Sequence, residues 1–165
     1  MHRQALNFFH DHLEHLPPLD VVEFGSCDMN GSVRIAYPQA KSWHGIDVQA
    51  GPNVDEIADC ADWTAPKPVD VILCAEVFEH TPRWREIIAN AHANLKPGGL
   101  FLASCATGRR PPHSAVDGGH LRPGEFYENV SAMAMSECRW GWSYFNVTPA
   151  DGYFGGDDLY LKAMR

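Results

Sequence analysis

Short apolar runs that alternate with helical patterns constrain the fold of this chain more than any other feature. The run VDVILCAE at residues 69–76 is continuous and apolar, as expected for a strand that is covered on both faces. Similar runs occupy residues 19–24, 43–48, 53–58 and 100–105. Because strands that alternate with helices pair through right-handed crossovers, we expect a mainly parallel sheet with helices on both faces. The fold class is therefore α/β, a three-layer sandwich.

The last part of the chain adds two strands to this sheet, at residues 140–147 and 157–164, which brings the expected total to seven. No helix is expected between these two strands. A parallel pair needs a crossover connection, so we expect the final strand to be antiparallel.

Three longer helices are expected, besides a short one that follows the loop at residues 25–31 and ends near Tyr37. Apolar residues at helical spacing predict a helix over residues 3–16. Thr81 is a good N-cap, and the helix that follows it is expected to stop at the Pro-Gly-Gly sequence of residues 97–99. A third helix is expected over residues 124–137, with three buried apolar side chains: Phe126, Val130 and Met133.

Length and composition limit the class of protein. The 165 residues suffice for one domain over residues 1–165, with an N-terminal helical segment at 1–18 and a long, functional loop at 106–124. The net charge of −8 makes nucleic acid an unlikely partner. The five cysteines include no C-x-x-C pair, which favours a reducing cytoplasm over a disulfide framework or a zinc ribbon. No signal peptide or membrane span is predicted.

The sequence VVEFGSCDMNG, which follows the first expected strand, suits a loop that lets a ligand approach the backbone. Glycine allows this approach because it has no Cβ. The loop lacks the dinucleotide fingerprint G-x-G-x-x-G, since Cys27 and Asn30 stand where glycines are needed. Glu23 and Asp28 would also repel a phosphate. The loop therefore favours a cofactor with a cationic end.

Two further acids follow neighbouring strands of the expected sheet. Asp47 ends the strand at residues 43–48, and Asp59 follows the strand at 53–58. Ligands of open α/β sheets bind beyond the carboxyl ends of the strands. Asp47 suits two ribose hydroxyls, because a carboxylate accepts two hydrogen bonds at once. Asp59 could accept a hydrogen bond from an adenine amine.

Taken together, these segments resemble the class I, Rossmann-like S-adenosylmethionine-dependent methyltransferases, in the branch that acts on small molecules. VVEFGSCDMNG resembles the first motif of that family, HGIDV its ribose-binding acid and IADCADW its adenine-binding turn. VDVILCAEVFEHT and LKPGGLFLAS resemble its fourth- and fifth-strand motifs. The resemblance covers residues 19–105 and implies S-adenosyl-L-methionine as the cofactor. Cys27 and the displaced Asn30 depart from the family pattern in the first loop.

The resemblance also implies the residues that would bind this cofactor. Glu23 lies near the methionine amino end, often through loop hydrogen bonds, and Gly25 and Ser26 line the methionine moiety together with the variant loop. Asp47 holds the ribose, Val48 packs on the adenine, and Asp59 and the Cys60 amide bind its edge. The full set implied in this way is Glu23, Gly25, Ser26, Cys27, Asn30, Asp47, Val48, Asp59, Cys60, Ala75 and Glu76.

Candidate general bases lie just after the fourth and fifth expected strands: His80, His113, Asp117 and His120. His80 could instead pack against the following helix and cap it, and the other three could stiffen a loop by bonding to its backbone. The His-x-x-x-Asp spacing with a second histidine also allows a metal site. We expect no metal, because no further ligand is apparent in the sequence.

The expected function is methyl transfer to an oxygen or nitrogen of a small or medium-sized acceptor. No N-P-P-Y or D-P-P-Y motif of amino-methylating DNA enzymes is present, since AEVF occupies residues 75–78. The alternative is a catalytically inactive cofactor-binding module that acts through a partner protein. A nicotinamide-dependent reductase is disfavoured by Cys27 and Asn30. A homo-oligomer is compatible with the sequence.

Overall fold

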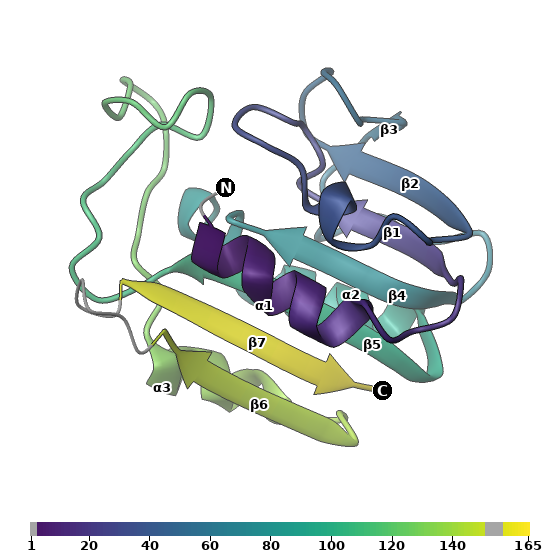
Figure 1. Ribbon diagram of the computed structural model, residues 1–165. Coiled ribbons are helices and arrows are strands. Elements are labelled where there is room, and N and C mark those ends of the chain that lie inside the picture. Colours follow the sequence, from purple (N-terminus) through teal and green to yellow (C-terminus); the bar gives the residue numbers. More distant parts are fainter. Residues whose placement is uncertain (1–2, 151–156) are drawn as a thin grey trace.

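A computed structural model describes residues 3–150 and 157–165, and its centre is a seven-stranded sheet (Figure 1). The strand order is β3-β2-β1-β4-β5-β7-β6. Only β7 runs antiparallel to its neighbours, β5 and β6. The expected α/β class and the antiparallel last strand are confirmed. The strands are β1 Asp20–Phe24, β2 Ser42–Asp47, β3 Glu56–Ile57, β4 Val69–Ala75, β5 Leu95–Ala106, β6 Tyr144–Pro149 and β7 Asp158–Met164.

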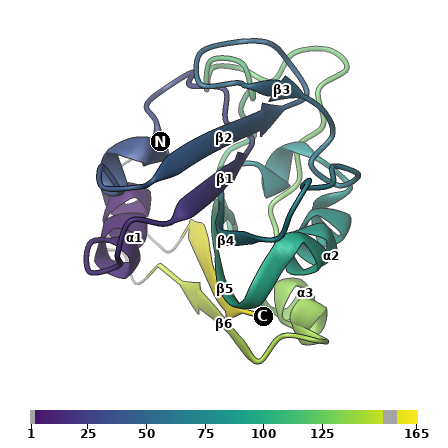
Figure 2. The ribbon, with the colours of Figure 1, turned by 90° about the vertical axis from the view of Figure 1, so that its right-hand side faces the viewer.

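Helices cover both faces of the sheet. The α-helix α1 (Arg3–Leu13) lies on one face, and α2 (Trp84–Asn94) and α3 (Ala132–Ser136) lie on the other (Figure 2). The described part of the chain also forms three short 3-10 helices: η1 Val33–Ala36, η2 Phe78–His80 and η3 Glu137–Arg139. The arrangement is a three-layer sandwich. Within the described residues, no helix has the length and apolar character needed to cross a membrane.

Alternate residues of the central strands build two separate cores. Val71 and Leu73 of β4 pack with Phe9 of α1 on one face. Ile72 and Cys74 of the same strand join the cluster around α2 on the other face. Successive side chains of a strand point to opposite faces, so a strand covered on both faces must be apolar throughout. This explains the uninterrupted run in β4.

The third expected helix is wrong in its extent. Residues 107–131 contain no regular helix or strand, and α3 begins only after Ser131, whose Oγ accepts a hydrogen bond from the Ala134 amide at 3.1 Å. Val130 is buried as expected, but Met133 is 77% exposed. The Val130 amide donates to the Ala106 carbonyl at 3.0 Å, which ties the segment to the end of β5 and prevents an earlier helix start.

Several boundaries also differ from the expected ones. α1 ends at Leu13, and α2 begins at Trp84. β5 begins at Leu95 and continues through the Pro-Gly-Gly sequence, where the Gly98 amide donates to the Arg165 carbonyl at 2.8 Å. The expected strand at 53–58 shortens to the two residues of β3.

The long loop after β5 is anchored to the start of β7. The Thr107 amide donates to the Asp157 carbonyl at 2.8 Å, and Arg110 pairs with Asp158. Because β7 runs opposite to its neighbours, its first residues lie at the edge where the parallel strands end. The loop is thereby held over that edge.

Candidate active site

A cleft of about 950 Å³ opens at the carboxyl ends of β1, β2 and β4, where the fold class places ligands. It is bordered by the loop after β1, the turn after β3 and the long loop after β5. Its lining includes every residue of the expected cofactor set: Glu23, Gly25, Ser26, Cys27, Asn30, Asp47, Val48, Asp59, Cys60, Ala75 and Glu76. Glu23 in β1, Asp47 at the end of β2 and Asp59 after β3 therefore border one space.

The loop after β1 begins with a close backbone approach. Gly25 has φ +73°, and a Cβ there would lie 2.1 Å from Cγ2 of Val77. The amides of Gly25 and Ser26 both donate to the Ile46 carbonyl. Ser26 is buried, and its Oγ has no hydrogen-bond partner within the described residues. A buried hydroxyl of this kind is suited to a ligand contact.

Asp47 joins the loops that follow β1 and β2. Its Oδ2 accepts a hydrogen bond from the Cys27 amide at 3.0 Å, and its Oδ1 accepts one from the Gln49 amide at 3.1 Å. Each carboxylate oxygen can accept a second bond, so acceptor capacity remains toward the cleft. The side chain is 9% exposed, which places this acceptor in a mostly dry environment.

Arg83 orients Asp59. The Asp59 Oδ2 accepts a hydrogen bond from Arg83 Nη1 at 2.6 Å, and its Oδ1 accepts one from the Ala61 amide at 2.8 Å. Arg83 also pairs with Asp62. The sequence analysis missed Arg83, because the partners are 24 residues apart and nothing local connects them.

Glu23 lies behind the same loop and is paired with Arg34. Its Oε2 accepts a hydrogen bond from Arg34 Nε at 2.9 Å, and Arg34 Nη2 also donates to the Asn53 carbonyl at 2.7 Å. Burial raises the pKa of Glu23 to about 7, although Arg34 opposes the rise. Glu23 therefore helps to fix the loop through Arg34, a residue that the sequence analysis did not single out.

This buried carboxyl predicts a pH dependence of stability. Between pH 4.5 and 7 the unfolded chain releases the Glu23 proton while the folded chain keeps it, so rising pH favours unfolding. Glu23→Gln removes this titration. Between pH 4.5 and 7, we expect the unfolding free energy of the wild type to fall by about 3 kcal/mol more than that of the variant. Urea unfolding at several pH values measures these free energies. The same dependence of unfolding free energy on pH in the two proteins would contradict the prediction.

The end of β4 carries a strained residue. Glu76 has φ +57°, which is uncommon for a residue with a side chain and is often found at functional sites. Its amide donates to the Ser104 carbonyl at 2.9 Å, and its Oε1 accepts a hydrogen bond from Ser104 Oγ at 2.6 Å. The guanidinium of Arg110 lies 3.7 Å from Oε2. These contacts hold Glu76 at the wall of the cleft.

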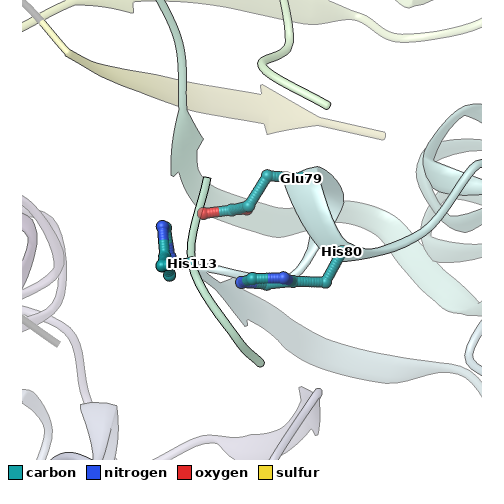
Figure 3. Close-up of side chains that lie close together, drawn as sticks. All are labelled: Glu79, His80 and His113. Atoms are coloured by element: carbon teal, nitrogen blue, oxygen red, sulfur yellow. The ribbon is translucent and has the colours of Figure 1, made fainter. Parts of the chain in front are cut away.

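Glu79 and His80 of η2 meet His113 of the long loop (Figure 3). Glu79 is fully buried, and burial together with the Glu76 carboxylate raises its pKa to about 8. Burial lowers the pKa of His80 to about 4, so this imidazole is neutral at pH 7. The rings of His80 and His113 lie 5.0 Å apart, and Tyr127 contacts both.

The four candidate bases separate into two groups. His80, His113 and His120 line the cleft, but Asp117 does not. The Asp117 carboxylate accepts a hydrogen bond from the Gly119 amide at 2.9 Å and pairs with Arg122, and these contacts hold its pKa below the usual value. The structure gives Asp117 a part in shaping the loop.

Sequence analysis also missed Glu79, whose buried position no local pattern reveals.

Comparison with known proteins gives one family and many similar folds. The family described as "Methyltransferase domain" matches residues 3–142. None of the proteins with curated descriptions matches this sequence.

Among solved structures, a Mesorhizobium loti S-adenosylmethionine-dependent methyltransferase is similar at a TM-score of 0.70 and 16% identity, with 96% of each chain covered. The N-methyltransferase NodS from Bradyrhizobium japonicum, in complex with S-adenosyl-L-homocysteine, gives a TM-score of 0.66 at 16% identity over 98% of this chain and 84% of that one. The Burkholderia thailandensis 1,6-didemethyltoxoflavin-N1-methyltransferase, with 1,6-didemethyltoxoflavin and S-adenosylhomocysteine bound, is similar at a TM-score of 0.65 and 17% identity. The match covers 99% of this chain and 77% of that one.

Proposed function

The chain belongs to the methyltransferase domain family, and on that premise we propose that it transfers the methyl group of S-adenosylmethionine to a small or medium-sized acceptor. One observation carries the proposal: Glu23, Asp47 and Asp59 border a single cleft at the ends of neighbouring strands. The proteins with a similar fold include enzymes that bind S-adenosylhomocysteine, the demethylated product of that cofactor.

The nucleoside end of the cofactor is assigned to the β2 side of the cleft. Asp47 is proposed to accept hydrogen bonds from the two ribose hydroxyls. Val48 is 70% exposed beside it and would pack on the adenine. Asp59 and the Cys60 amide would bind the edge of the base.

The methionine end is assigned to the loop after β1 and to the end of β4. Gly25 would let the methionine moiety approach the backbone, and the unpartnered Ser26 hydroxyl would gain a hydrogen bond. Ala75 and Glu76 would close the cleft near the sulfonium, where the Glu76 carboxylate complements its positive charge. The sulfonium methyl would then point toward the histidine side of the cleft.

The reaction is an in-line displacement. A lone pair of the acceptor forms a bond to the methyl carbon as the carbon–sulfur bond breaks. The electron pair of the broken bond stays on the sulfur and neutralises the sulfonium. The leaving group is already good, so most of the rate enhancement can come from holding the two reactants close and collinear. His80, His113 and His120 line the side of the cleft that would receive the acceptor, where a neutral imidazole could take its proton.

Calorimetry with S-adenosylhomocysteine and with NADH tests the cofactor assignment. We expect the first ligand to bind at one site per chain and the second to show no binding. NADH binding in place of S-adenosylhomocysteine would overturn the proposal in favour of a reductase. Transfer of a labelled methyl group to hydroxyl and amine acceptors then tests catalysis, and cofactor binding without transfer to any acceptor would support the inactive binding module.

A further inference from the structure

We infer that Glu79, His80 and His113 bind one divalent transition metal ion at the wall of the cleft. Each offers one ligand atom, and these atoms all lie within 4.8 Å of one another. Figure 3 shows the three side chains converging, two from η2 and one from the long loop. The metal site considered from the sequence was a different set, His113, Asp117 and His120. The present set shares only His113 with it and adds Glu79 and His80.

Buried atoms without partners point to a missing ligand at this place. Glu79 is fully buried and its Oε2 has no hydrogen-bond partner, and the same holds for the buried Nδ1 of His80. Across residues 3–150 and 157–165 only four buried side-chain atoms lack a partner, and two of them lie here. An unsatisfied buried polar atom destabilises the folded state, so a cation at this position would remove a penalty.

The surrounding contacts resemble the outer shell of a metal site. The second oxygen of Glu79 accepts a hydrogen bond from the Ala106 amide at 3.0 Å. His113 Nδ1 lies 3.1 Å from the Pro111 carbonyl and can donate to it, which leaves the Nε2 lone pair for a metal. Histidine ligands commonly hold their ring in this way. Ligand atoms around tetrahedral zinc lie about 3.4 Å apart, closer than the 4.8 Å within which these three atoms lie. His113 belongs to a loop, so a small movement of this residue can close the difference.

The local charge also suits a divalent cation. Arg110 interacts with three carboxylates in this region, those of Glu76, Glu79 and Asp158. Each of these carboxylates, when ionised, attracts a cation placed among them.

The ligand set indicates the class of ion. Two imidazoles and one carboxylate suit Zn²⁺ and leave a fourth position for a water or a substrate, whereas Mg²⁺ prefers oxygen ligands. His80 and His113 line the cleft, so the open position would face it. We therefore commit to a zinc-type ion.

Such an ion specifies the acceptor, an extension that depends on the proposed function. A hydroxyl bound to zinc loses its proton far more readily than a free one, because the metal stabilises the anion. With His80 and His113 as ligands rather than bases, the acceptor proton would pass to solvent. The acceptor oxygen held by the ion would form the new bond to the methyl carbon, and the carbon–sulfur bond would break with its electron pair kept by the sulfur. The acceptor is then an alcohol or phenol, and the reaction is an O-methylation.

Calorimetry of the metal-free protein with Zn²⁺ alone tests the site without any methyl donor or acceptor. We expect one ion per chain in the wild type, little binding of Mg²⁺, and at least about 100-fold weaker Zn²⁺ binding in Glu79→Gln and in His113→Ala. This loss should exceed the 10–100-fold that is typical of outer-shell partners. Thermal unfolding of each variant verifies that it is folded, and His113→Ala alters only a loop.

An exposed group on α1 provides the control. His10, Asp11 and Glu14 also place ligand atoms within 4.8 Å of one another. We expect His10→Ala to bind Zn²⁺ as the wild type does. Loss of binding in His10→Ala, or unchanged binding in Glu79→Gln and His113→Ala, would overturn the inference.

S-adenosylhomocysteine binding, measured on the same metal-free samples, separates this inference from the proposed function. Zinc binding without cofactor binding would remove only the proposed function and the acceptor assignment. Cofactor binding without zinc binding would remove the metal site and, with it, the acceptor assignment, and would leave the proposed function in place. Methyl transfer to amines but not to hydroxyls by the zinc-loaded protein would refute the acceptor assignment alone.

Discussion

Asp47→Ala is expected to weaken S-adenosylhomocysteine binding by about 100- to 10,000-fold. Two hydrogen bonds from ribose hydroxyls to one carboxylate contribute about 1.5–3 kcal/mol each, and 1.4 kcal/mol corresponds to a factor of ten. The substitution also removes the acceptor for the Cys27 and Gln49 amides, so the loop that borders the methionine end loses its attachment to β2. Calorimetry measures the change in affinity.

Asp11→Ala is the matched control for this variant. It removes the same group from the surface of α1, where the side chain is 72% exposed and is not part of the cleft lining. We expect unchanged affinity in this control and a folded Asp47→Ala protein by circular dichroism. If Asp47→Ala binds within twofold of the wild type, the ribose assignment is wrong.

Gly25→Ala is expected to lower the unfolding free energy by about 2–5 kcal/mol. Two costs add at this position. The left-handed φ of +73° costs a residue with a Cβ about 1–2 kcal/mol. The new methyl group would also lie 2.1 Å from Cγ2 of Val77, and overpacking of this kind typically costs about 1–3 kcal/mol. Urea unfolding gives the difference from the wild type.

Gly31→Ala separates the two costs. Gly31 has φ +103°, but no atom lies within 4 Å of the position that its Cβ would take, so only the backbone cost applies. We expect it to lose clearly less stability than Gly25→Ala. Val77→Ala should lower the unfolding free energy less in the Gly25→Ala background than in the wild type. The reason is that it also relieves the contact between the new methyl group and Val77. Equal losses in the two glycine variants would show that the close approach at Gly25 does not matter.

Most of the fold and the acidic residues of the site could be predicted from the sequence, and β4 illustrates the physical reason. A strand covered on both faces must be apolar throughout, so its pattern is visible without any tertiary information. The strand ends then place their acids, since parallel strands end at one edge of the sheet. Asp47 and Asp59 could be predicted to share a cleft in this way, and the structure brings both to its lining.

The partners of these acids could not be predicted, because they come from distant segments. Arg34 reaches Glu23 across 11 residues and Arg83 reaches Asp59 across 24, and neither pair has a local signature. The helix expected at 124–137 failed for a related reason. Its apolar spacing suited a helix, but hydrogen bonds of Val130 with Ala106 and Thr107, from the end of β5, override that local preference.

The inner position of β7 also bears on the order in which the domain assembles. β6 precedes β7 in the sequence, yet it touches the sheet only through β7. As the polypeptide emerges from the ribosome, the backbone groups of β6 have no partner strand until the final segment inserts beside β5. The same insertion supplies Asp157 and Asp158, which fasten the loop over the cleft. Insertion of β7 therefore both completes the sheet and anchors one border of the cleft.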